Sequence, residues 1–358
     1  MRILVATDAW LPQVNGVVRS MQAMAEHGRA LGAELVFLAP DRFRSIPMPG
    51  YSEIRLAFAR RRTVARLMRE AGADHVHIAT EGPIGFAARA ACLREGWPFT
   101  TAYHTRFPEY VSRRLPVPES WVYRLLRRFH APAAATMVAT PTLEADLAAR
   151  GFSGLVRWSR GVDTDLYRPR PDLPRPHPGP VFLHVGRLAV EKNVEGFLRL
   201  DLPGTKLVVG DGPARARLEA AYPQARFLGA LEGEALAQTY SAADVFVFPS
   251  RTDTFGLVLL EALASGLPVA AHPVMGPLDV LGQSGCGVMD EDLGRAALAA
   301  LAIPPELCRR HALGFDWAES ARQFLDAVRA GGAIGAASSS TGTEPARARD
   351  APVGRFGP

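Results

Sequence analysis

The chain has 358 residues, of which 48% are hydrophobic and 22% are charged. At roughly 150 residues per domain, this length predicts two domains with buried cores, and the composition excludes a disordered polymer. Three scattered cysteines favour neither a disulfide framework nor a zinc module. No apolar run reaches the ~18 residues needed to span a bilayer, and the first apolar run turns polar too early for a secretory signal. We therefore expect a cytoplasmic protein.

The formal net charge of +5 is modest for this length and gives little support to nucleic acid as a partner. Its distribution is more informative, because the arginine clusters all lie in the first half of the chain. They occupy residues 60–62, 113–114 and 124–128. A one-sided basic face suits an anionic surface, so we expect peripheral contact with the inner face of the cell membrane.

Short apolar runs alternate with helical patterns along the whole chain. In the first half the runs are Ile3–Thr7, Glu34–Ala39, His75–Ala79, Phe99–His104 and Thr136–Thr140. In the second half they are Val181–Gly186, Lys206–Gly210, Val245–Pro249, Pro268–Ala271 and Gly287–Met289. Continuous apolar strands separated by helices are typical of parallel sheets covered on both faces. The sequence predicts an α/β protein with two doubly wound, Rossmann-like domains.

A proline-rich segment marks the expected boundary between the domains. Residues 169–180 contain six prolines in twelve positions and predict a stiff linker. The N-terminal domain is then 1–168 and the C-terminal domain 181–312. Residues 313–330 read as a closing amphipathic helix, and 331–358, rich in Gly, Ala, Ser, Thr and Arg, as a disordered tail.

The segment 245–268 carries the strongest chemical signal. A strand ends near Pro249, a polar turn follows, and a helix is expected to begin near Phe255–Gly256, where free backbone N–H groups suit a phosphate. Asp253 and Glu261 lie eight residues apart, so they can reach opposite ends of one elongated ligand. A capping role for Asp253 and a solvated position for Glu261 are the alternative, but apolar residues flank Glu261 on both sides.

This segment resembles the family-4 retaining glycosyltransferases of the GT-B fold, whose two domains face each other across a cleft. The family has an acid, seven residues and a glutamate, with Phe-Gly between them and Ala-x-Gly-x-Pro-Val after them. The resemblance implies that Glu261 holds the ribose hydroxyls of a nucleotide sugar. It implies donor-sugar contacts for Asp253, Thr254, Phe255, Gly256 and Leu257. The family usually has glutamate at the first position, and aspartate is one methylene shorter.

A second element runs from His184 to Asn193. Arg187 follows a strand and Gly186, and Lys192 comes five residues later, so both can point at one anion. An Arg/Lys pair alone is more typical of a solvated surface. The family uses this pair to bind the donor diphosphate, and two fixed cations stabilise a leaving diphosphate without a metal. The resemblance also implies donor binding at Gly186 and Gly210, where glycine lets the backbone approach a nucleotide.

The N-terminal half supplies a third element. Asn15-Gly16 is typical of a turn that approaches a ligand closely, although a plain turn fits equally well. A single histidine after a strand, such as His104, is more often structural than catalytic. The resemblance places Gly16 against the donor diphosphate and His104 beside the donor sugar. Arg160-Gly-Val-Asp163 also matches the family, so the resemblance runs from Met1 to about Val328.

Two acidic pairs resemble metal sites, but their positions favour structural roles. Asp163 and Asp165 directly precede the proline-rich segment, and Asp290 and Asp292 follow the last strand with no histidine close by. We expect no metal and no cofactor. A dehydrogenase is disfavoured because no G-x-G-x-x-G follows the first strand, and the chain has no Walker A loop.

The expected activity is therefore transfer of a sugar from a nucleoside diphosphate to an acceptor hydroxyl. The resemblance implies retention at the anomeric carbon, with Arg187, Lys192, His104 and Asp253 as catalytic residues. The region around His104 looks closest to sulfoquinovosyl- and glycosyl-diacylglycerol synthases, so the expected acceptor is a membrane lipid. A soluble or polysaccharide acceptor, as in mannosyl transfer, and a non-catalytic nucleotide-sugar-binding protein are the alternatives.

The segment 120–130 leaves two interpretations open. Trp121, Val122, Leu125, Leu126 and Phe129 form one helical stripe beside several arginines. A core-facing helix with a solvated basic edge is slightly favoured. The other interpretation is a helix that docks on anionic lipid.

Overall fold

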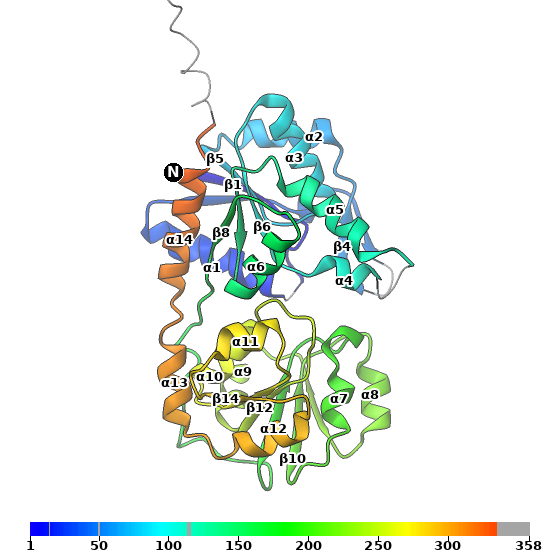
Figure 1. Ribbon diagram of the computed structural model, residues 1–358, viewed down its shortest axis with the longest axis vertical. Coiled ribbons are helices and arrows are strands. Elements are labelled where there is room, and N and C mark those ends of the chain that lie inside the picture. Colours follow the sequence, from blue (N-terminus) through cyan, green and yellow to red (C-terminus); the bar gives the residue numbers. More distant parts are fainter. Residues whose placement is uncertain (14, 49–50, 113–115, 335–358) are drawn as a thin grey trace, which may run out of the picture.

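The computed structural model describes residues 1–13, 15–48, 51–112 and 116–334. These residues form two α/β domains, each built on a parallel six-stranded sheet (Figure 1). The predicted fold class is thereby confirmed. The arginine pair at 113–114 lies outside the described residues, as do residues 335–358 of the expected disordered tail 331–358. Its first residues are described, and Ile334 N donates to the carbonyl of Asp74 at 2.8 Å, so the tail was predicted to begin too early.

The N-terminal sheet has the strand order β2-β1-β5-β6-β7-β8, and all its neighbouring strands are parallel. Its strands are β1 (Arg2–Ala6), β2 (Glu34–Leu38), β5 (His75–Ile78), β6 (Thr100–Tyr103), β7 (Ala135–Val138) and β8 (Leu155–Arg157). The first five match predicted apolar runs. The sixth, β8, gave no such signal because it is a short edge strand with two exposed side chains.

Seven helical segments and a hairpin connect these strands. They are α1 (Gly16–Ala30), η1 (Pro40–Arg42), β3 (Ser45–Met48), β4 (Tyr51–Ala57), α2 (Arg61–Glu70), α3 (Pro83–Glu95), α4 (Phe107–Ser112), α5 (Glu119–His130) and α6 (Pro141–Ala149). Alternate residues of β1 point to two separate cores. Ile3 and Val5 pack with α1 and the C-terminal helix α14 (Trp317–Ala330), whereas Leu4 and Ala6 pack with α2 and α3. This two-sided burial explains the unbroken apolar run.

The C-terminal sheet repeats the pattern with the order β11-β10-β9-β12-β13-β14. Its strands are β9 (Val181–Val185), β10 (Thr205–Val209), β11 (Arg226–Gly229), β12 (Val245–Phe248), β13 (Val269–Ala271) and β14 (Gly287–Met289). Its helices are η2 (Val190–Lys192), α7 (Val194–Leu198), α8 (Arg215–Ala221), α9 (Gly233–Ser241), α10 (Leu257–Ala264), α11 (Met275–Leu281), α12 (Leu293–Ala300) and α13 (Pro305–Ala312). Only the partly exposed edge strand β11 was not predicted.

The chain crosses between the domains twice, and the two crossings lie side by side. Val162 N donates to Phe315 O at 3.1 Å, and a Cβ on Gly161 would lie 2.4 Å from the backbone nitrogen of Trp317. After the second crossing, α14 lies along the N-terminal domain (Figure 1), where Trp158 Nε1 donates to Ser320 Oγ at 3.0 Å. The C-terminal helix therefore ties the end of the described chain back to the first domain.

The proline-rich segment 169–180 lies along the C-terminal domain. Arg175 pairs with Asp244 at 2.8 Å, and Thr205 Oγ1 donates to the carbonyl of Pro178 at 2.9 Å. The passage from one domain to the other thus occurs before this segment, near Gly161.

Helix α5 combines features of both interpretations left open by its sequence. Val122, Leu126 and Phe129 are buried, as a core-facing helix requires. Trp121 and Leu125 are instead 64% and 52% exposed, because they lie on the opposite edge of the helix. The predicted single apolar stripe was therefore wrong for these two residues. No helix in the described part of the chain is long and apolar enough to cross a membrane.

Candidate active site between the two domains

The N-termini of two helices meet where the domains face each other. Asn15 begins α1, and its Oδ1 accepts hydrogen bonds from Val17 N and Val18 N, both at 3.0 Å. A Cβ on Gly16 would lie 3.6 Å from Cδ1 of Leu257, the first residue of α10 in the other domain. The predicted Asn-Gly turn is thus a helix start. Two helix dipoles with their positive ends toward one place favour an anion there.

The loop after β9 brings a lysine to the aspartate of the predicted acid pair. Asn193 adopts a left-handed conformation (φ 51°), and its Nδ2 donates to the carbonyl of Pro249 at 3.1 Å, which joins the two loops. Lys192 Nζ consequently lies 2.5 Å from Oδ1 of Asp253. Burial acts to raise the pKa of Asp253, but the Lys192 charge and hydrogen bonds outweigh it, so the pKa lies below its ordinary value. Arg187 is half-buried at the start of the same loop.

Gly186 and Gly210 pack against each other. Gly210 has φ 137°, and a Cβ there would lie only 1.9 Å from the carbonyl oxygen of Gly186. No other residue type fits this approach. The packing fixes the loop that carries Arg187 and Lys192, and it gives these two glycines a structural reason in addition to the expected donor contact.

His184 lies beneath this loop and was not among the predicted site residues. Its Nδ1 is 3.2 Å from the carbonyl oxygen of Val247, and a Cβ on Gly186 would lie 3.4 Å from its Nε2. Burial lowers the pKa of His184 to about 4, so the ring is neutral at pH 7. It supports the loop without adding charge to it.

The turn before α10 has a fixed backbone. Gly256 has φ 86°, and a Cβ on Gly276 of α11 would lie 2.7 Å from the carbonyl oxygen of Phe255. Thr254 Oγ1 donates to the carbonyl of His104 in the opposite domain at 2.7 Å. The predicted donor-sugar residues thus lie in one turn that touches the N-terminal domain.

His104 is buried and held by an arginine. Arg160 Nη2 lies 3.3 Å from Nδ1 of His104, and because a guanidinium only donates, Nδ1 must accept and the ring proton resides on Nε2. Burial, followed by the charge of Arg160, lowers the pKa of His104 well below its ordinary value. The Nε2–H group has no hydrogen-bond partner among the described residues. His104 is therefore a neutral donor at pH 7.

The sequence analysis assigned no role to Arg160 beyond its place in the motif 160–163. In the structure, Arg160 orients His104. Its guanidinium stacks on Trp158 at 3.9 Å from the ring centroid and donates to the carbonyl of Trp158 at 2.7 Å. Burial lowers the pKa of Arg160 to about 9, which leaves it charged at neutral pH. Segment 158–162, where the chain first crosses between the domains, thus contributes to the site as well as to the connection between the domains.

Glu261 is buried in the middle of α10, as its apolar neighbours indicated. Tyr240 donates its hydroxyl to Oε2 of Glu261 at 2.9 Å, and Arg19 of the N-terminal domain pairs with Oε1. Both partners were missed by sequence reasoning, since neither carries a motif. The carboxylate is therefore fixed by one residue from each domain.

The acidic pairs that resemble metal sites have structural roles. Asp163 Oδ1 accepts from the backbone nitrogens of Asp165 and Leu166 at 3.0 and 2.9 Å. Asp290 pairs with Arg295, and Asp292 caps α12. Among residues 1–334, apart from the positions left undescribed, no group of three or more His, Cys, Asp and Glu side chains is arranged to hold a metal ion.

Comparison with known proteins covers both domains. Residues 14–166 match the family described as Glycosyltransferase Family 4, and residues 179–303 match the family described as Glycosyl transferases group 1. A GDP-mannose-dependent alpha-mannosyltransferase of Mycobacterium tuberculosis is 34% identical over 78% of this chain and 81% of that protein. The chain belongs to the family of glycosyltransferases that these two descriptions define, family 4 and group 1. The resemblance drawn from the motifs is thereby confirmed.

Two further members of the family have names that refer to lipid products or sulfoquinovose. The sulfoquinovosyl transferase SQD2 of Arabidopsis thaliana is 31% identical over 75% of this chain and 58% of that protein. The alpha-monoglucosyldiacylglycerol synthase of Acholeplasma laidlawii is 28% identical over 75% of this chain and 79% of that protein. The names of these relatives thus refer to different sugars.

Solved structures share the architecture of both domains. Sucrose-phosphate synthase of Thermosynechococcus elongatus has a TM-score of 0.72 at 21% identity, covering 92% of this chain and 98% of that one. Anabaena HepE, solved in complex with UDP and glucose, has a TM-score of 0.69 at 15% identity, covering 92% and 99%. These likenesses confirm the GT-B fold of this glycosyltransferase.

Proposed function

We propose that this glycosyltransferase moves a sugar from a nucleoside diphosphate to an acceptor hydroxyl, with retention of the anomeric configuration and without a metal. The observation that carries the proposal is the approach of the α1 and α10 N-termini, where a Cβ on Gly16 would lie 3.6 Å from Cδ1 of Leu257. Lys192 and Arg187 lie on the loop that packs beside this place. A diphosphate is the donor group that such a set of N–H groups and cations stabilises.

The other predicted residues take the remaining parts of the donor. Glu261, about one turn into α10, binds the ribose hydroxyls, because a carboxylate accepts from both. Asp253, Thr254 and the backbone of 255–256 contact the sugar. His104 donates its Nε2–H to a sugar hydroxyl, since this proton has no partner among the described residues and the ring is neutral.

The reaction follows from the charges. The bond between the anomeric carbon and the diphosphate oxygen breaks, the acceptor oxygen bonds to that carbon on the same face, and its proton passes to the leaving phosphate oxygen. Lys192 and Arg187 stabilise the charge that develops on the diphosphate, which is the role a metal fills elsewhere. Asp253 is paired with Lys192 and keeps that ammonium in place. Closure of the cleft excludes water and limits hydrolysis of the donor.

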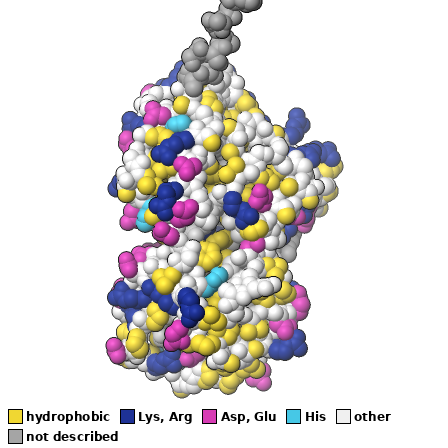
Figure 2. Space-filling model, turned by 60° about the vertical axis from the view of Figure 1, so that its left-hand side comes forward, with side chains coloured by type: hydrophobic (Ala, Val, Ile, Leu, Met, Phe, Trp, Pro, Cys, Tyr) yellow, Lys and Arg dark blue, Asp and Glu magenta, His cyan; other side chains and the backbone are white. Residues whose placement is uncertain are grey.

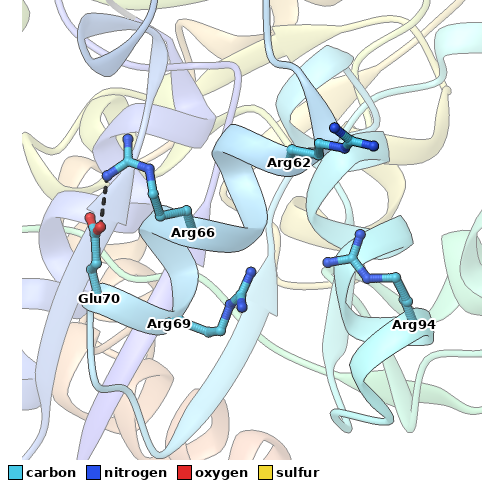
Figure 3. Close-up of a pocket in the computed structure, with 5 residues that line it drawn as sticks. All are labelled: Arg62, Arg66, Arg69, Glu70 and Arg94. Carbon is cyan, nitrogen blue, oxygen red and sulfur yellow. Dashed lines mark hydrogen bonds and ion pairs between the residues drawn. The ribbon is translucent and has the colours of Figure 1, made fainter.

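For the acceptor we propose a membrane lipid such as diacylglycerol. Two relatives are named alpha-monoglucosyldiacylglycerol synthase, and this chain has a surface suited to lipid. Arg62, Arg66 and Arg69 of α2 and Arg94 of α3 line a pocket of about 600 Å³ (Figure 3), with Glu70 at its margin bound to Arg66 at 2.7 Å. Arg94 is likewise paired with Glu95 at 2.7 Å, so four arginines against two acids leave an excess of positive charge that favours a phosphate-bearing surface.

Helix α5 continues the same layer of helices. Arg89 of α3 donates to the carbonyl of Phe129 in α5 at 2.8 Å, so α3 and α5 lie side by side. The outer edge of α5 presents Trp121 and Leu125, with the exposed Arg124 and Arg128 beside them. Exposed aromatic and basic residues together are typical of helices that rest in a membrane interface. We therefore place the enzyme at the inner face of the cell membrane as a peripheral protein.

A second candidate keeps the reaction and changes the substrates. The M. tuberculosis relative, at 34% identity, is named as GDP-mannose-dependent. Mannosyl transfer to a soluble or polysaccharide acceptor is therefore the alternative to lipid glycosylation.

One experiment tests the reaction class. The purified enzyme is incubated with donor and acceptor in excess EDTA, and the anomeric configuration of the product is determined by NMR. We expect full activity in EDTA and an α-linked product from an α-linked donor. Inversion, or activity restored only by a divalent cation, would contradict it. Donor binding without any transfer or hydrolysis would favour a non-catalytic binding protein.

A further inference from the structure

The buried carboxylate of Glu261 is held from two domains at once. Tyr240, on α9 of the same domain, donates to Oε2 at 2.9 Å, and Arg19, in the first turn of α1, pairs with Oε1. Each carboxylate oxygen thus already accepts from a protein donor. With the Glu261 side chain only 7% exposed, little of its surface is open to a ligand.

The two partners differ in how firmly they are fixed. Tyr240 is fully buried and packs against Tyr167 at 5.7 Å and against Phe246 at 5.7 Å between ring centroids. The Arg19 side chain is 30% exposed and lies on the opposite domain, so any opening of the cleft withdraws it. The Glu261 charge, against the effect of burial, raises the pKa of Arg19. Arg19 is therefore a charged, removable partner, and Tyr240 is a permanent one.

We propose that Arg19 occupies the ribose-binding edge of Glu261 when the two domains are closed on each other and must leave before a donor nucleotide binds, whereas Tyr240 is the positioning residue. The inference rests on the ribose role proposed above for Glu261. A ribose diol needs hydrogen-bond acceptor positions on this carboxylate. Arg19 occupies the position at Oε1 and leaves it when the cleft opens. Tyr240 keeps its bond to Oε2 and holds the carboxylate in the orientation that the ribose meets.

This arrangement couples donor binding to domain opening. A closed state that cannot bind the nucleotide reduces its apparent affinity in proportion to the fraction of molecules that are open. Two other contacts join the domains at the same level: Thr254 Oγ1 to the carbonyl of His104 at 2.7 Å, and Thr142 Oγ1 to Asp279 at 2.7 Å. Both are neutral donors, so the Arg19–Glu261 pair is the charged contact among these three. Figure 2 shows the molecule narrowing at this level.

The two partners of the carboxylate predict opposite effects on binding. Arg19→Gln removes the competitor, and we expect UDP or GDP, whichever binds the wild type, to bind roughly threefold to thirtyfold more tightly. Tyr240→Phe leaves the ring packing but loses the orienting hydroxyl, and we expect binding to weaken. A purely structural role for the cluster would weaken binding in both variants. Arg29→Gln, which changes an exposed arginine on the same helix, is the matched control.

Calorimetric titration of each variant with UDP and with GDP distinguishes the outcomes. Tighter binding by Arg19→Gln together with weaker binding by Tyr240→Phe supports the proposal. Weaker or unchanged binding by Arg19→Gln overturns it, since Arg19 would then be a ligand of the diphosphate or irrelevant to the donor. Absence of nucleotide binding in the wild type and in every variant contradicts the proposed function itself rather than the role of Arg19.

A distance measurement provides an independent readout. Spin labels are attached to cysteines introduced as Ala30→Cys on α1 and Ala220→Cys on α8, both exposed, while the three native cysteines are buried. The ligand-free wild type should give one short, narrow interdomain distance distribution, and Arg19→Gln a longer or broader one. Identical distributions in the two proteins would contradict a closing role for the ion pair even if both variants fold.

Discussion

Lys192 and Asp253 form an ion pair of 2.5 Å between loops that are 61 residues apart in the sequence. The lysine is one of two in the chain, and the aspartate is the first acid of the pair predicted to contact the donor. Since the aspartate fixes the ammonium beside the N-terminus of α10, the pair places positive charge where we propose that the leaving diphosphate lies.

Loss of the loop cations should lower turnover more than donor binding. We expect Lys192→Ala and Arg187→Ala each to reduce kcat by about 10²- to 10³-fold, because charge on the leaving group develops mainly in the transition state. Steady-state kinetics with a saturating donor measure this. Arg226→Ala, an exposed substitution on β11, is the control. Unchanged turnover in both variants would remove these residues from the mechanism.

Turnover should depend on the negative charge at position 253 more than on the length of the side chain there. Asp253→Asn keeps the shape but releases the ammonium of Lys192, so we expect kcat to fall at least about tenfold. Asp253→Glu should retain much more activity than Asp253→Asn, since the family usually has glutamate here. Equal losses in the two variants would show that the charge is not the relevant property.

The sequence predicted the interior of the fold better than its edges. Strands such as β1 and β9 are buried on both faces and therefore appear as continuous apolar runs. The edge strands β8 and β11 and the β3–β4 hairpin expose side chains and gave no such signal. The exposure of Trp121 depends on which edge of α5 faces the sheet, which the periodicity placed wrongly.

The candidate site was predictable to the extent that it lies in local motifs. The motifs predicted Lys192, Asp253 and Glu261 as site residues. Each of these residues lies beside a glycine turn or in an apolar helix. Arg19 could not be predicted, because its partner Glu261 lies 242 residues away in the other domain. Arg160 was quoted within a motif, but only the folded crossing segment shows that it orients His104.

Three buried histidines should make the protein sensitive to mild acid. Burial lowers the pKa of His77 to about 3 and of His184 to about 4, and that of His104 falls well below 6.5. In the unfolded chain these histidines bind protons near their ordinary pKa of about 6.5, whereas in the folded protein they do so only at lower pH. The stability that depends on the neutral rings is therefore complete above pH 6.5 and decreases as the pH falls below it. We expect protonation of His77 and of His184 each to remove on the order of 2–3 kcal/mol of stability between pH 7 and 4.5.

Urea titrations at these two pH values measure the free energies of unfolding. His77→Gln should flatten the dependence relative to wild type, whereas substitution of the half-buried His27 should leave it unchanged. A free energy of unfolding that is independent of pH between 7 and 4.5 would contradict the neutral, buried state of these rings.

The arginine-lined pocket of α2 and α3 should control binding to anionic membranes. Replacing Arg62, Arg66, Arg69 and Arg94 with glutamine removes four charges from one surface (Figure 3). At about 1 kcal/mol per charge near an anionic surface, we expect at least a tenfold loss of binding to phosphatidylglycerol vesicles, decreasing further with salt. Sedimentation with vesicles measures this.

Neutral phosphatidylcholine vesicles serve as the control for charge, and Trp121→Ala tests the apolar contribution of α5. Retained binding by the four-residue variant would place the membrane contact elsewhere or remove it. Activity on a soluble acceptor should survive all these substitutions, since none of them touches the site between the domains.

Transfer of label tests the central claim most directly. The purified enzyme is incubated with each of a panel of labelled UDP-, GDP- and ADP-sugars and with vesicles that contain diacylglycerol and anionic lipid, and the products are extracted into organic solvent. We expect one donor to label the organic phase in the wild type and Lys192→Ala to abolish this transfer. Label that stays in the aqueous phase for every donor would contradict the lipid acceptor, and a complete absence of nucleotide release would contradict glycosyl transfer itself.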